Sequence, residues 1–134
     1  MSDQCRSLAW DGELSDAAKR GHAAIYRMNR ELREAVRPGV LPSDLYRLTM
    51  RLFEEEGYDS LTPQAGHSLG RVAHEPPFLV EGSDRPFEPG MIVVVEPTMR
   101  LAGVGSINIE DTTVVTEDGC EVLTSTPREW DAFL

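Results

Sequence analysis

The chain has 134 residues, of which 13 are basic and 23 acidic, giving a formal net charge of −10. This length fits one domain, and the acidic balance argues against nucleic acid or an anionic membrane as a partner. No apolar run reaches the roughly 18 residues that span a bilayer, and Met1-Ser2-Asp3-Gln4 lacks the basic-then-apolar pattern of a secretory signal. Cys5 and Cys120 form no C-x-x-C motif. We therefore expect a soluble cytoplasmic protein.

The first half of the chain predicts an edge strand and two helices. Ser2–Trp10 is a short mixed stretch that the Asp11-Gly12 turn closes. A helix is predicted from Ser15, a suitable N-cap, to the helix-breaking Arg37-Pro38-Gly39, and a second from Pro42 to Gly57. Each has apolar residues at helical spacing on one face, namely Ile25, Met28, Leu32 and Val36, then Leu45, Leu48, Leu52 and Phe53.

The second half of the chain changes to strands and turns. Met91–Val95 predicts a buried strand, and Asp118-Gly119 predicts a hairpin that joins Thr112–Thr116 to Cys120–Thr124. Ser125–Leu134 is expected to be a short tail that contains one helical turn. Two apolar-faced helices followed by strands predict an α+β fold, with both helices on one face of a largely antiparallel sheet.

Histidines and glutamates in the strand-rich half suggest a metal site. His67 lies between Gly66 and Ser68, Glu96 ends the apolar run, and Glu110 lies in an alternating segment. Imidazole and carboxylate groups from neighbouring strands are a typical ligand set for a borderline-to-hard divalent metal. Hydration at the strand end explains Glu96 equally well, and an ordinary solvent-facing position explains Glu110 better when that residue is taken alone.

Three spaced motifs lie in the strand-rich half of the chain. They are Gly66-His67…His74-Glu75-Pro76-Pro77, Glu88-Pro89-Gly90-Met91…Glu96-Pro97 and Ile109-Glu110-Asp111-Thr112…Thr116-Glu117-Asp118-Gly119. Together they resemble a family of metal-dependent hydrolases with the pita-bread fold, which includes methionine aminopeptidases, proline-specific aminopeptidases, prolidases and creatinases. The Ser2–Ser7 segment is also similar to the family's Ser-Asp-x-Thr-Arg-Thr strand, so the resemblance covers essentially the whole chain.

The resemblance implies a role for five side chains. Asp3, His67, Glu96 and Glu110 would be ligands of a divalent metal, for which Mn²⁺, Co²⁺, Fe²⁺ and Zn²⁺ are candidates. Glu96 would also act as the general base, and His74 would hold the substrate carbonyl or stabilise the tetrahedral intermediate. Residues 1–134 would form a single domain, the C-terminal half of a catalytic domain, with two helices packed on a curved, mostly antiparallel sheet.

The resemblance further implies hydrolysis of an N-terminal peptide bond, often one next to proline. Asn108 stands where proline-specific members usually carry arginine, so this position does not support specificity for such peptides. Because the family also contains enzymes that act on small amides, the expected substrate is a peptide or a small amide. The alternatives are a catalytically inactive remnant that binds metal or a partner, and a purely structural interaction module. We also expect a homodimer or a complex with a separately encoded N-terminal half, because half of such a fold would leave a sheet edge and apolar surface uncovered.

Overall fold

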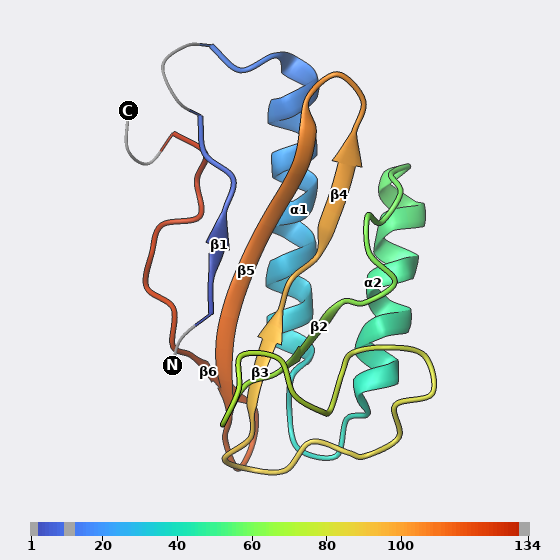
Figure 1. Cartoon of the computed structure of the whole chain (residues 1–134), viewed down its shortest axis with the longest axis vertical. Helices are drawn as coiled ribbons and strands as arrows, with labels where there is room; N and C mark the ends of the chain where they lie inside the picture. Colours follow the sequence, from blue (N-terminus) through green and yellow to red (C-terminus); the bar gives the residue numbers. More distant parts are fainter. Residues whose placement is uncertain (1–2, 10–12, 132–134) are drawn as a thin grey trace.

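The computed structural model describes residues 3–9 and 13–131. Two long helices lie on one side of a sheet whose strands run along the longest axis of the molecule (Figure 1). The elements in chain order are β1 (Cys5–Arg6), α1 (Asp16–Ala35), α2 (Pro42–Glu56), β2 (Gly66–Ser68), β3 (Ile92–Val95), β4 (Thr98–Leu101), β5 (Gly105–Val115) and β6 (Cys120–Val122).

Strand β5 is the centre of a six-stranded sheet in which every pairing is antiparallel. On one side β5 pairs first with β4 and then with β3, which in turn pairs with β2. On its other side β5 pairs with β1 and with β6. The predicted α+β fold, with two helices on a mostly antiparallel sheet, is therefore confirmed.

The helices begin and end where their capping residues predict. The Ser15 hydroxyl accepts a hydrogen bond of 3.2 Å from the Ala18 amide at the start of α1. Helix α2 starts with Pro42, whose missing amide proton costs nothing in the first turn. It ends at Gly57, which adopts the left-handed conformation with φ of 72°.

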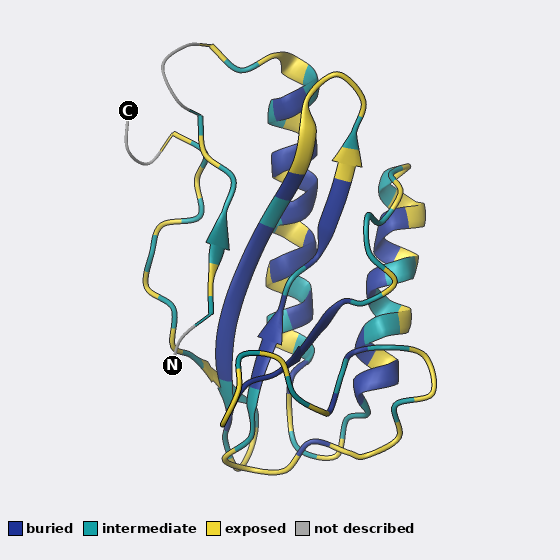
Figure 2. Cartoon of the chain, viewed as in Figure 1, coloured by how far each residue is buried: buried dark blue, intermediate teal, exposed yellow. Residues whose placement is uncertain are grey.

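The hydrophobic core lies between the helices and the sheet. Figure 2 shows the buried stripe along α1 facing the buried parts of β3 and β5. Ile25 and Met28 of α1 pack with Ile107 and Ile109 of β5 in one cluster, and a second cluster contains Leu32 and Val93. Because side chains alternate along a strand, the residues between these apolar ones point to the other face of the sheet.

The two ends of the chain differ from the sequence-based expectation. Of the strand expected at Ser2–Trp10, only Cys5–Arg6 forms a strand, while Ser2 and Trp10 lie outside the described residues. Residues 125–131 contain a turn but no helix, and the rest of the expected tail is likewise outside the described residues. No helix in the described part of the chain is long and apolar enough to cross a membrane. The cytoplasmic location stays a prediction.

Candidate metal centre

Strand β2 places His67 in the interior of the molecule, on the sheet. Its neighbour Gly66 has φ of 155°, and a Cβ there would lie 2.0 Å from the carbonyl oxygen of Val94, so only glycine fits where β2 pairs with β3. The side chain of His67 is fully buried. Its Nδ1 lies 3.0 Å from the Ser68 carbonyl oxygen, which can only accept a hydrogen bond. Nδ1 therefore carries the proton, and Nε2 is left with a free lone pair.

His67 Nε2 has no hydrogen-bond partner among the described residues, although it is buried. Two glutamates lie next to it. Glu96, directly after β3, has its Oε1 at 3.8 Å from His67 Nε2, and Gln64 donates a hydrogen bond of 3.3 Å to the same oxygen. Glu110 projects from β5, and the three potential ligand atoms lie within 4.8 Å of one another.

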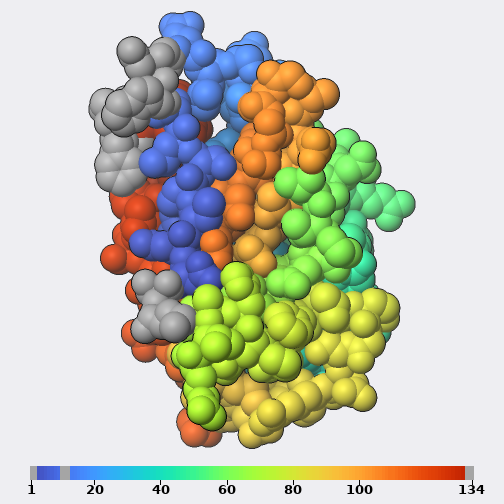
Figure 3. All heavy atoms as spheres, viewed as in Figure 1, coloured from blue at the N-terminus to red at the C-terminus, as the bar shows by residue number. Residues whose placement is uncertain are grey.

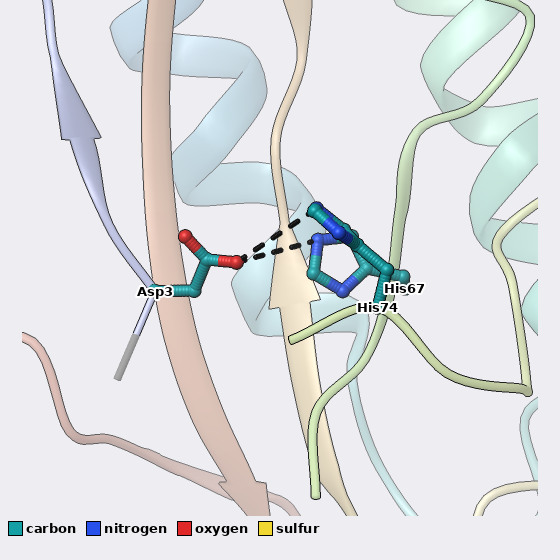
Figure 4. Close-up of side chains that lie close together, drawn as sticks. All are labelled: Asp3, His67 and His74. Carbon is teal, nitrogen blue, oxygen red and sulfur yellow. Dashed lines mark ion pairs between the residues drawn. The ribbon is translucent and has the colours of Figure 1, made fainter. Parts of the chain in front are cut away.

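Asp3 approaches this cluster from the segment before β1, as Figure 4 shows. Its Oδ2 lies 3.9 Å from His67 Nε2 and 3.9 Å from His74 Nε2. The hydroxyl of Thr112 donates a hydrogen bond to the Asp3 carbonyl oxygen and so ties this segment to β5. The N-terminal segment therefore supplies a third carboxylate to the centre.

His74 is the exposed member of the cluster, with 63% of its side chain accessible. Its ring lies 4.2 Å from that of His67, centroid to centroid, in an edge-on arrangement. The loop that carries it is closed by a backbone bridge between Ser68 and Glu75. The Glu75 carboxylate accepts hydrogen bonds from the amides of Arg71 and Val72 inside this loop. His74 therefore stands at the solvent side of the centre on a structured loop.

The centre has an excess of negative charge. Burial, followed by the charges of Asp3 and Glu96, raises the pKa of Glu110 to about 8, while the charge of Arg6 opposes the shift in part. Burial also raises the pKa of Glu96, although His67 and a hydrogen bond from Gln64 lower it in part. Both shifts have the same origin, since each carboxylate is partly removed from water beside other carboxylates. Nearby positive charge would relieve this arrangement.

A divalent cation fits this set of side chains. Three carboxylates and one imidazole match a borderline-to-hard ion, and the buried, unpartnered Nε2 of His67 is ready to donate its lone pair. Two ligands that each lie about 2.1 Å from one ion are separated by about 3 to 4.2 Å. The separations of 3.8 Å and 3.9 Å between His67 Nε2 and the oxygens of Glu96 and Asp3 fall within that range.

The five side chains singled out in the sequence thus converge at one place, from the N-terminal segment, β2, the loop after it, the end of β3, and β5. The geometry also groups His74 with Asp3 and His67, although the resemblance gave His74 a role toward the substrate. Sequence analysis missed the supporting contacts of Gln64 and Thr112. Thr112 had a usable signal, since it lies two residues from Glu110 on the same face of β5.

The antiparallel sheet with its two helices thus carries a cluster of histidine and carboxylate side chains that could hold a metal ion. The chain belongs to metallopeptidase family M24, whose model matches residues 1–117. It is 32% identical over 133 residues to an Xaa-Pro dipeptidase of Lactobacillus helveticus, covering 96% of this chain and 35% of that protein.

Solved structures give the same family relationship. An Xaa-Pro dipeptidase from Bacillus anthracis matches with a TM-score of 0.90 and 34% identity, covering 97% of this chain and 37% of that chain. Dipeptidase PepE from Mycobacterium ulcerans matches with a TM-score of 0.87 and 30% identity over 97% of this chain and 35% of that one. The chain therefore spans about a third of the length of these relatives.

Proposed function

We propose that this chain binds one divalent metal ion through Asp3, His67, Glu96 and Glu110 and serves the hydrolysis of N-terminal peptide bonds, often bonds next to proline. The observation that carries the proposal is the buried, unpartnered Nε2 of His67 among carboxylates at ion-sharing distances. The substrate class is supported by the Xaa-Pro dipeptidases among the relatives. Mn²⁺, Co²⁺, Fe²⁺ and Zn²⁺ all suit this ligand set.

The chain's own residues divide the work of hydrolysis between them. The ion, when bound, lowers the pKa of water and polarises a carbonyl group. Glu96 is suited to be the general base, because burial raises the pKa of its carboxyl toward neutrality while 23% of the side chain remains in contact with solvent. His74, exposed beside Asp3, is suited to donate a hydrogen bond to the substrate carbonyl oxygen as negative charge develops there.

Calorimetric titration of the chelator-stripped chain with Mn²⁺ tests the metal site. We expect one tightly held ion per chain and a large loss of affinity in Glu96→Gln. Glu88→Gln is a matched control, since Glu88 is 60% exposed and pairs only with Arg85 across 3.5 Å in the described structure. A wild-type chain that binds no ion, or two ions equally tightly, contradicts the proposal.

A hydrolysis screen with Xaa-Pro dipeptides and small amides, run on the Mn²⁺-loaded chain, tests the reaction. We expect release of the N-terminal residue, and we expect Glu96→Gln to abolish it while circular dichroism shows an intact fold. A chain that holds its ion tightly but hydrolyses none of these compounds is the metal-binding, catalytically inactive form of the family. That result overturns the catalytic half of the proposal and leaves the metal half standing.

The proposal includes the organisation of the protein. Residues 1–134 are taken to be one domain, equivalent to the C-terminal half of a catalytic domain, and to work as a homodimer or with a separately encoded N-terminal half. Light scattering over a dilution series measures the mass, and a monomer at every concentration argues against the homodimer.

A further inference from the structure

Asp111, the residue directly after Glu110, lies at the centre of a second buried charge cluster. Its side chain is completely inaccessible and contacts three arginines. Its oxygens lie 2.7 Å from Arg6 Nη2, 2.7 Å from Arg128 Nε and 3.2 Å from Arg33 Nε. The hydroxyl of Thr124 donates a further hydrogen bond of 2.6 Å. Every lone-pair region of this carboxylate is therefore engaged.

The arginines come from three separate parts of the chain. Arg6 belongs to β1, Arg33 to the last turn of α1, and Arg128 to the C-terminal segment, residues 123–131. The Arg6 guanidinium also donates to the Glu110 carbonyl oxygen of β5. One carboxylate thus joins the beginning and the end of the described chain to the central strand.

The C-terminal segment runs along β1 on the side away from β5, where Figure 3 shows the N-terminal residues between the two. Arg6 donates hydrogen bonds to the carbonyl oxygens of Thr126 and Pro127, and the Ala9 amide donates to the Trp130 carbonyl oxygen over 3.0 Å. The hydroxyl of Thr126 donates to the side chain of Gln4. Residues 4–9 are therefore held from both sides.

This arrangement bears on the metal centre because Asp3 lies two residues before β1. A strand of two residues makes few hydrogen bonds, and a chain end is poorly ordered unless something ties it down. Apart from the Thr112 hydroxyl, the pairing with β5 and the approach of the Asp3 carboxylate to His67 and His74, the described contacts that hold this end come from Arg6 and the C-terminal segment.

We propose that the C-terminal segment positions the metal ligand Asp3, with Arg128 and Arg6 as positioning residues that act through Asp111. This inference rests on the proposed metal-binding function. The residues of this cluster touch neither substrate nor ion; they set the distance between β1 and β5, and thereby the place of the Asp3 carboxylate. Loss of the Arg128 contact should loosen β1 and weaken metal binding.

Coulomb's law predicts the opposite change in metal affinity, so the direction of the measured change is informative. Removing an arginine near a cation site leaves more net negative charge and should strengthen cation binding if charge alone matters. Positioning predicts weaker binding, as for other residues that orient metal ligands. The direction of the change therefore separates the two effects.

The experiment compares Arg128→Met with Arg85→Met in the full chain. Arg85 is 66% exposed and pairs with exposed Glu88, so its replacement makes the same change in charge without touching β1. We expect Arg128→Met to raise the dissociation constant for Mn²⁺ about tenfold, in keeping with the effect of partners that orient metal ligands. Arg85→Met should leave it unchanged or slightly lower. Equal or tighter binding by Arg128→Met overturns the inference.

Amide hydrogen exchange of the metal-free chain supplies a readout that does not depend on the ion. The Ser7 amide donates to the Asn108 carbonyl oxygen of β5, so its protection reports how firmly β1 is docked. We expect Arg128→Met to speed exchange at Ser7 while Met28 in the buried face of α1 stays protected. Unchanged protection at Ser7 in Arg128→Met overturns the inference, whether or not the wild-type chain binds metal. Absence of metal binding by the wild-type chain contradicts only the proposed function.

Arg128→Lys covers the case in which Arg128→Met also loses protection in α1. Lysine keeps the charge but cannot form the two-pronged contact with Asp111. We expect it to retain the fold, with Ser7 exchange and Mn²⁺ affinity between those of the wild type and Arg128→Met. Wild-type values for both measurements would show that charge suffices and that the fixed geometry of Arg128 plays no positioning role.

Discussion

Glu110 and Asp111 are neighbours on β5, and both are buried, yet their surroundings are opposite. Glu110 lies among other acids, which together with burial raise its pKa to about 8. For Asp111, burial would also raise the pKa, but hydrogen bonds from Arg128 and Thr124 and the charge of Arg6 hold it below its usual value. Adjacent strand residues point to opposite faces, so one step along the chain separates these environments.

The comparison shows that burial alone does not decide the state of a carboxylate; the neighbouring charges do. The protein supplies positive charge to Asp111 from three of its own arginines, whereas at Glu110 the charge of Arg6 offsets the raised pKa only in part. A buried charge without compensation is costly. Asp111 is therefore suited to hold the structure together, whereas Glu110 is suited to receive a cation from outside.

The largest expected effect comes from removing the charge of Asp111. Asp111→Asn leaves the buried guanidinium of Arg6 and the partly buried ones of Arg33 and Arg128 without their common partner. Breaking a buried charge pair from one side typically costs about 3 to 5 kcal/mol. Urea unfolding should show this loss of stability. In Glu88→Gln, an exposed pair, we expect a change within about 0.5 kcal/mol. A loss below about 1 kcal/mol in Asp111→Asn would remove the contrast between the two carboxylates.

The equivalent change at Glu110 should act on metal binding and leave the fold standing. Glu110→Gln removes a proposed metal ligand, so we expect the affinity for Mn²⁺ to fall at least about 100-fold. Above about pH 8, where the Glu110 carboxyl ionises in the wild type, the metal-free variant should be more stable by about 0.2 to 1 kcal/mol, because it lacks one of several neighbouring like charges. Calorimetry and urea unfolding measure the two effects. Glu121→Gln, at an exposed position on β6, is the control. Destabilisation of the metal-free variant above pH 8 would argue against the excess of negative charge.

The stability of the metal-free chain should depend on pH in the direction that Glu110 sets. Its pKa is raised from 4.5 to about 8 in the folded chain, so its contribution to stability is fully present below pH 4.5 and is lost as the pH rises through 8. Unfolding by urea at several pH values should show a decline on the order of 1 kcal/mol or more from about pH 5 to about pH 9. Glu110→Gln should largely abolish the decline. A flat wild-type profile would show that Glu110 is not held in its protonated form.

His22 should give a smaller effect of opposite sign. This buried histidine of α1 has no hydrogen-bond partner for Nε2 among the described residues. Burial lowers its pKa from 6.5, although a backbone contact with Arg128 opposes the shift. The unfolded chain therefore takes up the proton first, and stability falls by up to about 1 kcal/mol as the pH drops through 6.5. His22→Gln should flatten the profile below that pH and leave the Glu110 decline unchanged. If the stability of this variant still falls below pH 6.5 as in the wild type, other groups cause that fall.

Much of the fold followed from local signals in the sequence. Ser15, Pro42 and Gly57 marked helix ends correctly because capping depends on residues close together in the chain. The apolar run before Glu96 became β3 for the same kind of reason. The expected strand at Ser2–Trp10 was too long, since pairing with β5 and not local propensity determines its extent.

The metal centre and the arginine cluster differ in how far the sequence reveals them. The spacing of His67, Glu96 and Glu110 formed a motif pattern that resemblance could recognise. Asp111 lay within the same motif, and its position on the face of Ile109 implied a charge that needs a partner. No periodicity connects it to Arg6 and Arg128, which are brought together only by the folded chain.

The two environments around β5 also protect the register of the sheet. A slip of one residue would turn every side chain of β5 to the opposite face. A slip in one direction would bring Ile109 to the position of Glu110, beside Asp3 and Glu96. A slip in the other direction would put Thr112 in the place of Asp111 and leave the arginines without a carboxylate. Since β5 pairs with β1, β3, β4 and β6, either misalignment would spread to four strands. Charge thus helps this sequence to discriminate against misfolded pairings that its β-branched residues alone would tolerate.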